Sequence, residues 1–293
     1  MERIDFRDQI SKNKWKSVWL VFVVILIIVA LGYAISFAFS PDYFFTIMII
    51  AILFSLFYSW ILYYNSGKVA VWSVGAKPAD RIKHKQFYSL VEGLTIASGL
   101  SMPKLYVMDS KQINAFASGR NPKNAVVCVT EGALEKLDRR ELEGVLAHEL
   151  GNVGSYDIRY MTLVAVLVGM ISIISEIFLR SLWFKSSGND NNKGQIIFVI
   201  IGIALAIIAP IIVYLVQMSI SRKREYMADA SAVKFTRYPD GLINALKKIQ
   251  AENIQPEKKI SKALAPLFIS SPFKNLMGTH PPIEKRIEAL RKM

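Results

Sequence analysis

The sequence predicts an α+β membrane protein that is mainly helical, with four transmembrane or membrane-associated helices and a polar domain that contains a small antiparallel sheet. Three observations lead to this fold class. Four long apolar runs alternate with polar segments, the polar segments carry helix-type and strand-type patterns, and basic residues gather beside the runs. The hydrophobic fraction of 53% agrees with this class, because it lies above the range of ordinary soluble proteins.

The first two apolar runs, Val18 to Phe39 and Tyr43 to Tyr64, contain no Lys, Arg, Asp or Glu. Each is about 22 residues long, which is enough to cross a bilayer core of roughly 30 Å. The first run is too long for a signal peptide, and the second follows it after only Ser40 to Asp42. We therefore expect a membrane hairpin that the mature protein retains.

The third and fourth runs are Tyr160 to Leu182 and Ile196 to Ile220. Glu176 and Arg180 lie one helical turn apart in the third run, where we expect them to neutralise each other near the membrane surface. The sequence does not fix how deeply these two runs enter the bilayer. A Ser-, Gly- and Asn-rich stretch over residues 185–195 joins them as an external loop.

The positions of Lys and Arg predict how the chain is oriented. These residues precede the first run and follow the second and the fourth: Arg3, Arg7, Lys12, Lys14, Lys16, then Lys68, Lys77, Arg81, Lys83, Lys85, then Arg222, Lys223, Arg224. By the positive-inside rule, both termini and the polar domain face the cytoplasm. The net charge of +13 is not accompanied by a basic, aromatic-interleaved motif, so we expect no nucleic-acid partner.

The polar segments predict a helical domain with one small sheet. Ala79 to Leu100 has the pattern of an amphipathic helix that begins near Pro78 and Asp80. Three strand-type runs follow, and we expect them to form the antiparallel sheet: Lys104 to Met108, Ile113 to Ser118 and Ala125 to Thr130. Cys128 is the only cysteine, so no internal disulfide can form, and its apolar run predicts a buried thiol.

Helices fill the rest of the polar sequence. Thr130 and Glu131 open a short helix, and Asp138 is placed to cap a longer helix from Arg139 to Val153. Three more helices are expected after the fourth apolar run, over Ser221 to Phe235, Tyr238 to Ala251 and Pro282 to Lys292.

The helix from Arg139 to Val153 carries the candidate metal-binding residues. His148 and Glu149 are followed, one turn after His148, by Asn152. Two histidines at this spacing share a helix face and can hold one Zn²⁺, while the intervening Glu can deprotonate a metal-bound water. With Asn at the second position, only half of that pair is present.

A further ligand can come from Glu225, which shares a helix face with Asp229. Glu225 could bind the metal while Asp229 fixes the tautomer of an imidazole. The alternative is that both carboxylates belong to a solvated, basic helix face.

Four separated motifs resemble the HtpX-type membrane zinc metallopeptidases, which are related to the CAAX-prenyl endopeptidases. The motifs are Asn114 to Gly119, Val145 to Asp157, Arg224 to Asp229, and Thr279 to Pro282 with Arg286. The resemblance covers almost the whole chain and implies a zincin-like metallopeptidase domain. It also implies an endopeptidase of the cell inner membrane, often stress-induced, that degrades misfolded or damaged membrane proteins from the cytoplasmic side and can cleave itself.

The resemblance assigns roles by position. His148, Asn152 and Glu225 occupy the positions of the ligands to one Zn²⁺, Glu149 that of the general base, and Asp229 that of the carboxylate that orients a ligand. Transition-state stabilisers are expected at Asn114, His280 and, as a weaker candidate, Arg286. His280 could instead serve only as a helix-entry residue. An extended substrate is expected to pair with the strand through Ile113, Ala115, Phe116, Ala117 and Ser118.

This resemblance divides the chain into four segments. Residues 1–65 form the basic N-terminus and first hairpin, 66–158 the first part of the catalytic domain, 159–220 the second hairpin, and 221–293 the second part of the catalytic domain. The expected partners are the lipid bilayer and unfolded membrane proteins. Substrate identity, cleavage specificity and oligomeric state do not follow from the sequence.

Asn152 predicts that this chain is inactive as a protease. An amide oxygen is a poor substitute for imidazole at zinc, so zinc should bind weakly or not at all. Either the sequence is a ligand knockout of an active protease, or it is a natural pseudoprotease that serves as a substrate-binding scaffold. The presence of the other catalytic elements favours the first.

Overall fold

The computed structural model describes residues 44–163, 222–252, 268–269 and 281–293, together with a few single positions between 11 and 26. Most of the first apolar run, almost all of the third, the whole fourth, the loop between the third and fourth, and His280 lie outside the described residues. The predictions made for them therefore stay predictions.

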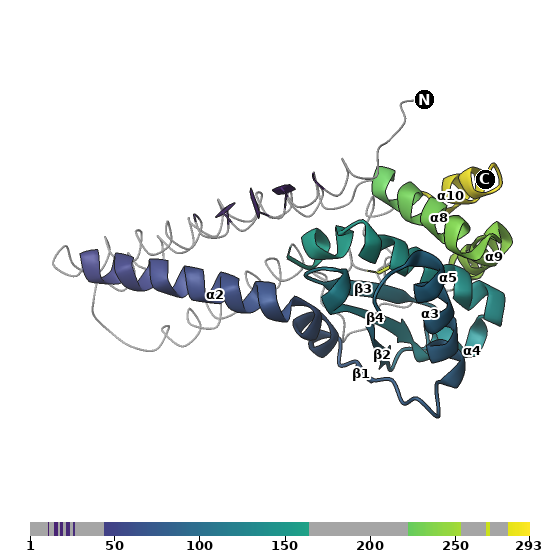
Figure 1. The fold of residues 1–293 in the computed structure, drawn as a ribbon, viewed down its shortest axis with the longest axis horizontal. Helices are drawn as coiled ribbons and strands as arrows, with labels where there is room; N and C mark the ends of the chain where they lie inside the picture. The colour runs from purple at the N-terminus through teal and green to yellow at the C-terminus, as the bar shows by residue number, and fades with distance from the viewer. Residues whose placement is uncertain are drawn as a thin grey trace, which may run out of the picture.

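The second apolar run forms most of α2, which extends from Phe44 to Ser73. Figure 1 shows this helix projecting away from the rest of the described chain. Large apolar side chains along it are exposed, among them Ile50, Leu53, Phe57 and Trp60. Within the described ranges, we find no helix that combines the length and the apolar character needed to cross a membrane.

The sheet has four strands in the order β1, β2, β4, β3. Its strands are β1 (Lys77–Pro78), β2 (Lys104–Met108), β3 (Ala115–Gly119) and β4 (Ala125–Thr130). The bounds predicted for the strands that are β2 and β4 in the structure are confirmed. The strand β1 was not expected.

The prediction of an antiparallel sheet is wrong, because β2 and β4 pair in parallel. The loop after β2 carries the chain past the position of β4, so that β3 forms the edge and β4 returns between them, antiparallel to β3. A strand-type run does not specify which strand it pairs with, so the order along the chain suggested antiparallel neighbours. In the structure the chain crosses over, and the loop after β2 is held by the start of the next helix, where the amide of Gly132 donates to the carbonyl oxygen of Ser110.

Two hydrophobic clusters cover the two faces of the sheet. Alternate residues of a strand point to opposite faces, so Val127 and Val129 pack into one cluster while Val126 and Cys128 pack into the other. The larger cluster includes α3 (Lys85–Ser98) and α5 (Arg139–Gly154), and the smaller includes the end of α2. Cys128 is buried, as predicted.

The start predicted for the first polar helix is wrong. Asp80 does not cap a helix directly; its Oδ1 accepts hydrogen bonds from the amides of Ile82 and Lys83 in a turn. The helix α3 begins only at Lys85 and ends before Gly99, whose φ of 70° lies in the left-handed region.

The remaining helices lie close to their predicted positions. They are α4 (Glu131–Lys136), α5, α8 (Arg222–Thr236), α9 (Pro239–Ala251) and α10 (Ile283–Leu290). Thr130 and Asp138 cap α4 and α5 as predicted, and Asp138 forms a capping box with Glu141. In Figure 1, α8, α9 and α10 lie beside α5, at the end of the domain remote from the free end of α2.

Candidate metallopeptidase site

The central helix α5 carries three of the predicted site residues on one side. His148 and Glu149 are almost completely buried, and Asn152 is half-buried one turn later. This burial places the imidazole and the carboxylate inside the domain rather than on a solvated helix face.

Close packing of α8 on α5 brings the other candidate residues to the same place. A Cβ atom added at Gly151 would lie 2.9 Å from the Cβ of Ser231 and 3.2 Å from the carbonyl oxygen of Ala228. Glycine therefore permits the close approach of the two helices. Both Glu225 and Asp229, one turn apart on α8, are buried against α5. The alternative of a solvated carboxylate face on α8 is excluded for these two residues.

A hydrogen-bonded network joins His148, Asp229 and Arg286. The Nδ1 of His148 lies 2.9 Å from Oδ1 of Asp229. Arg286 donates to both oxygens of Asp229, from Nη2 at 2.6 Å and from Nε at 2.9 Å. Because the carboxylate of Asp229 can only accept, the His148 proton is best placed on Nδ1, from which it is donated to Asp229. Nε2 then keeps its lone pair for a metal.

Glu225 lies on the other side of the imidazole. Its Oε2 is 3.8 Å from Nε2 of His148 and 3.4 Å from Nη1 of Arg286. Nε2 of His148 is buried and has no hydrogen-bond partner among the described residues. The two atoms that the sequence assigned to a metal thus face each other in the folded chain.

These charges shift the pKa values of the buried groups. Burial alone would raise the pKa of Asp229, but the charge of Arg286 and the hydrogen bonds from His148 and Arg286 lower it. Burial would likewise lower the pKa of His148, and the hydrogen bond to Asp229 turns the net shift upward. Burial opposes the charged form of Arg286 as well, yet Asp229 raises its pKa overall.

Glu149 has the strongly raised pKa that suits a general base near neutral pH. Burial raises its pKa to about 7, helped by the nearby charge of Glu225, while His148, the backbone of Ala117 and Arg286 lower it. Neither carboxylate oxygen makes a hydrogen bond within the described part of the chain. This carboxylate is therefore buried beside β3.

The predicted substrate strand is buried, and its outer edge is partly paired. Ile269 donates from its amide to the carbonyl oxygen of Ala115 at 3.0 Å, and Phe116 forms an antiparallel bridge with Phe268. Ser118 bonds through its hydroxyl to Thr162 at 2.7 Å. A substrate strand that pairs with β3 must therefore add beyond Phe268 and Ile269 or displace them.

Asn114 directly precedes this strand. It is 4% exposed, and its side-chain Oδ1 accepts a hydrogen bond from the amide of Ala115. Its backbone amide and carbonyl are both bonded to Thr130.

Arg286 bonds to a residue that the sequence did not suggest as its partner. It is 1% exposed and donates to both carboxylate oxygens of Asp229. The sequence carried a signal for this placement. On α10, Arg286 takes one position of the apolar stripe formed by Ile283, Ile287 and Leu290, and an arginine in such a stripe is expected to have a buried acid partner.

A second buried pair was not expected from the sequence. Arg224 Nη1 lies 3.4 Å from Oδ1 of Asp157, and both side chains are nearly inaccessible. The pair ties the start of α8 to the segment after α5, next to Glu225.

Comparison with known proteins identifies the family. A family model described as peptidase family M48 matches residues 81–293. The chain is 41% identical to a protease HtpX homolog of Caldanaerobacter subterraneus, over 97% of this chain and 96% of the relative. It is also 41% identical to one of Dictyoglomus thermophilum, with 100% and 96% covered. The chain belongs to peptidase family M48.

A further curated relative agrees with this assignment. A protease HtpX homolog of Thermoanaerobacter pseudethanolicus is 40% identical over 100% of this chain and 99% of the relative. The crystal structure of Ste24p from S. mikatae matches with a TM-score of 0.49 and 20% identity, covering 97% of this chain and 66% of Ste24p. The M48 family consists of zinc metalloendopeptidases, so this chain has the scaffold of a metalloprotease.

The residues present fit a zinc ion only in part. The buried Nε2 of His148 and the carboxylate of Glu225 are suitable donors that face each other. Asn152, on the same side of α5, offers a neutral amide. In the described part of the chain, no three His, Cys, Asp or Glu side chains are grouped so as to hold a metal.

Proposed function

We propose that this chain is a zinc-dependent membrane endopeptidase of family M48 in a form inactivated at Asn152. The observation that carries the proposal is the buried network of His148, Asp229 and Arg286 facing Glu225, with Glu149 on the adjacent position of α5. Burying several charges is costly, so a cluster of this kind indicates a functional site.

Two of the three zinc positions are suitable as they stand. His148 and Glu225 would hold the ion, and Asp229 would keep the imidazole in the required tautomer. When bound, zinc would polarise the scissile carbonyl and acidify the attacking water. Asn152 leaves the set incomplete, so this chain should bind zinc weakly and hydrolyse peptides very slowly.

The remaining roles follow from what each residue can do chemically. Glu149 would take a proton from the attacking water and deliver it to the leaving amine, for which a pKa of about 7 is well suited. Asn114 and His280 would stabilise the charge that develops on the scissile carbonyl oxygen. For Arg286 we propose the holding of Asp229, in place of a direct role at the substrate.

The substrate would be an extended polypeptide that adds to the edge of β3, as peptides add to exposed sheet edges in other proteins. The residues proposed to line this edge are Ile113, Ala115, Phe116, Ala117 and Ser118. We propose unfolded or damaged membrane proteins as the natural substrates, with self-cleavage as a related reaction.

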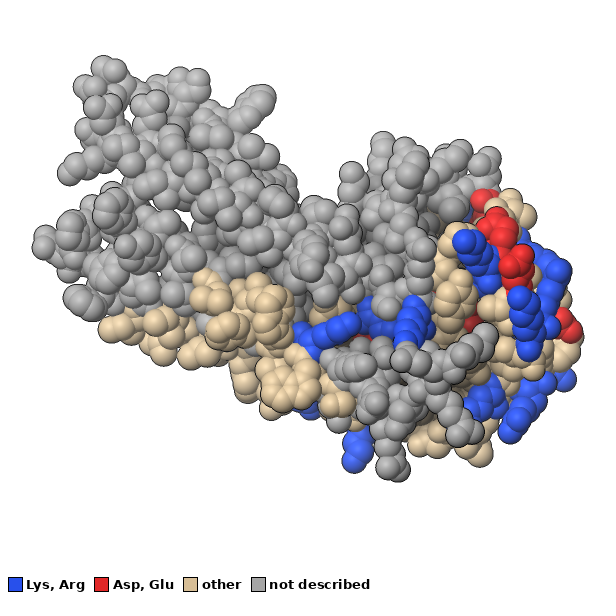
Figure 2. All heavy atoms as spheres, turned by 90° about the horizontal axis from the view of Figure 1, so that it is seen from above, with Lys and Arg blue, Asp and Glu red and all other residues tan. Residues whose placement is uncertain are grey.

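The proposed location is the cell inner membrane, with the catalytic domain and both termini in the cytoplasm. Support comes from α2, on which a series of exposed apolar side chains leads up to Tyr63 and Tyr64. Arg159 and Arg120 lie over these two rings. Aromatic and basic residues at the end of an apolar helix are typical of a membrane boundary. Figure 2 shows Lys and Arg between the tan part of α2 and the rest of the domain.

The experiment that tests the function is to restore the missing ligand. Asn152→His, purified in detergent with zinc, is expected to bind about one zinc per chain and to cleave an unfolded membrane protein or itself. The unchanged chain should do neither. Adding Glu149→Gln to the restored chain should abolish cleavage but leave zinc bound, because the Glu149 carboxylate is the proposed base and does not bind the metal.

The second candidate function is a natural pseudoprotease that captures substrate without cutting it. Capture of a substrate would need only β3. This strand is buried and well packed, which favours the scaffold role. It predicts that Asn152→His changes neither zinc content nor cleavage, while unfolded peptides still bind. Metal analysis of the two chains side by side separates the candidates.

A further inference from the structure

The loop between β2 and β3 is fastened on one side by the start of α4. The carbonyl oxygens of Gln112 and Asn114 accept from the hydroxyl of Thr130 at 2.6 and 3.0 Å, and that hydroxyl also accepts from the amide of Asn114. The amide of Gly132 donates to Ser110. There is no space for a side chain at Gly132, where a Cβ would lie 2.2 Å from the carbonyl oxygen of Lys111.

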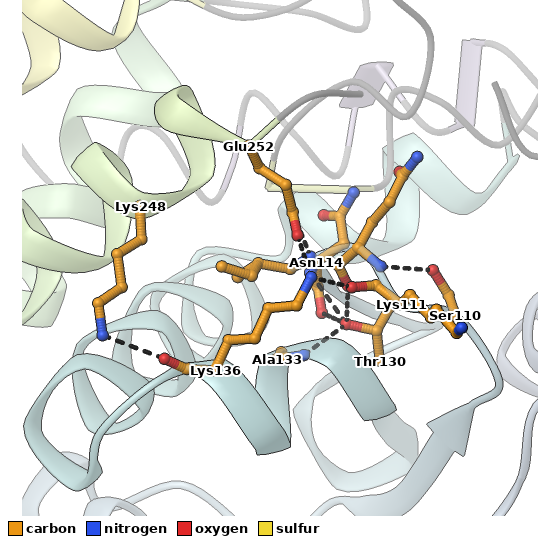
Figure 3. Close-up of polar contacts among 10 residues, drawn as sticks. Ser110, Lys111, Asn114, Thr130, Ala133, Lys136, Lys248 and Glu252 are labelled. Carbon is orange, nitrogen blue, oxygen red and sulfur yellow. Dashed lines mark hydrogen bonds and ion pairs between the residues drawn. The ribbon is translucent and has the colours of Figure 1, made fainter. Parts of the chain in front are cut away.

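A carboxylate from a distant helix fastens the same loop on its other side. Glu252, at the end of α9, accepts a hydrogen bond at Oε2 from the amide of Ile113 at 2.7 Å. Its Oε1 is bonded to the ammonium group of Lys136, which also donates to the carbonyl oxygen of Lys111. Figure 3 shows these contacts meeting in one place, with Glu252 reaching down from α9 to the loop.

This arrangement fixes the backbone where the chain enters the proposed substrate strand β3. Ile113 and Asn114 are consecutive, so the two fastenings act on neighbouring peptide groups from opposite sides. An amide bonded to a carboxylate is held more firmly than one bonded to a neutral acceptor. The direction in which the chain enters β3, and with it the placement of Asn114, therefore depends on a residue 139 positions away in the sequence.

We propose that Glu252 is a positioning residue for catalysis: it holds the amide of Ile113 so that Asn114 is directed at the scissile bond of a polypeptide paired with β3. This inference rests on the proposed function and adds one positioning residue to the proposed site. Glu252 itself does not touch the substrate. It links the end of α9 to the start of the substrate strand.

The first test measures the contact in the chain as it is and needs no enzymatic activity. Hydrogen exchange followed by mass spectrometry should show Glu252→Ala raising the exchange rate of the segment 109–116 at least tenfold, with α5 unchanged. Glu252→Gln keeps an acceptor oxygen and should stay within about threefold of the unchanged chain. Glu135→Ala, which removes an exposed carboxylate from α4, is the matched control and should change nothing. An unchanged exchange rate in Glu252→Ala overturns the proposal.

The second test uses the Asn152→His chain and separates positioning from stability. Glu252→Ala should lower kcat at least tenfold at unchanged zinc content, and Glu252→Gln should recover most of the loss. In a chain that also carries Asn114→Ala, the further change Glu252→Ala should lower kcat less than twofold, because the effect passes through Asn114. The proposal is contradicted if Glu252→Ala and Glu252→Gln lower kcat equally. It is also contradicted if the effects of Glu252→Ala and Asn114→Ala on kcat are fully additive.

The two tests also separate this inference from the function on which it rests. If Asn152→His neither binds zinc nor cleaves, the proposed function fails, and the catalytic part of the inference fails with it. The exchange result still decides whether Glu252 holds the loop. If Asn152→His is active and Glu252→Ala keeps its kcat, only the inference is wrong.

Discussion

The buried side chain of Arg286 determines how the candidate ligands are held. Its guanidinium lies between Asp229 and Glu225, two carboxylates on the same face of α8, and beside His148. Without this positive charge, two acids would be buried near one imidazole, at a large desolvation cost. Arg286 therefore balances the negative charge of the two buried carboxylates.

Replacing Arg286 should destabilise the protein because it leaves Asp229 without its main partner. We expect Arg286→Ala to lower the free energy of unfolding by about 3–5 kcal/mol. Arg286→Lys should recover only part of this, since an ammonium group cannot bond both oxygens of Asp229 as the planar fork does. Arg291→Ala, which removes an exposed arginine one residue beyond α10, should change stability by less than about 0.5 kcal/mol. Thermal unfolding in detergent measures all three, and similar losses at the two arginines would contradict the assignment.

Glu149 predicts a pH dependence of stability in the metal-free chain. Its pKa is raised from 4.5 to about 7 in the folded state, so folding favours the protonated form. Below the pKa of Glu149 in the unfolded chain, this stabilisation of the folded state is fully present. It is lost as the pH rises through the pKa of Glu149 in the folded chain. Glu149→Gln should therefore be more stable than the unchanged chain by about 1–3 kcal/mol at pH 8. The difference should vanish near pH 5.

Denaturant unfolding at the two pH values measures this effect. Glu143→Gln, on the same helix, is the control and should show no such pH-dependent gain, because Glu143 is partly exposed and paired with Arg140. An equal gain at both pH values would mean that the Glu149 carboxylate is not protonated in the folded chain.

At the scale of elements, the distance between α5 and α8 determines the site. The two helices carry His148 and Glu225, and they touch at Gly151, where any side chain would collide with α8. A larger residue at this position would separate the helix axes and move the two candidate ligands apart. Gly151 is thus part of the candidate site, although it carries no functional group.

Gly151→Ala should move α8 away from α5 and weaken the site. We expect a loss of about 1–3 kcal/mol in stability from overpacking. In the Asn152→His chain, we also expect zinc affinity to fall at least tenfold. Gly93→Ala is the matched control: Gly93 is exposed on α3 with open space around it, so alanine should stabilise that helix by about 0.5–1 kcal/mol. Unfolding curves and zinc titration measure the two effects, and an unchanged zinc affinity in Gly151→Ala would show that the approach of the helices is not critical.

At the scale of the whole molecule, the candidate site is assembled from segments that lie on either side of residues 164–221. The network joins α5, before this stretch, to α8 and α10, after it. The smaller cluster also joins the end of α2 to the sheet, through Val71, Phe116 and Cys128. The proposed membrane hairpins would therefore be coupled to the domain at both ends.

The proposed orientation predicts a one-sided sensitivity to protease. In inside-out vesicles of the inner membrane, added trypsin should digest the domain, because its many Lys and Arg residues would face the outside solution. In sealed right-side-out vesicles, the domain should stay intact. Alkaline washing should not release the chain from either kind of vesicle. Digestion in right-side-out vesicles, or release by the wash, would refute the proposed topology.

What the sequence by itself determined are the features that depend on local interactions. The cap at Asp138 gave the start of α5, and the strand-type runs gave the bounds of β2 and β4, because caps and periodic patterns act within a few residues. The spacing of His148 with Glu149, and of Glu225 with Asp229, likewise placed each pair on one helix. Family resemblance then joined these pairs into one site.

Only the tertiary structure decided how these pieces meet. Three contacts join residues that are far apart in the sequence. They are the parallel pairing of β2 with β4, the hydrogen bonds from Arg286 to Asp229 and the hydrogen bond from Ile113 to Glu252. Such contacts form when burial removes competing water, and no local pattern specifies which distant partner will be there. For this reason, the bonds from Arg286 to Asp229 and from Ile113 to Glu252 were not expected from the sequence.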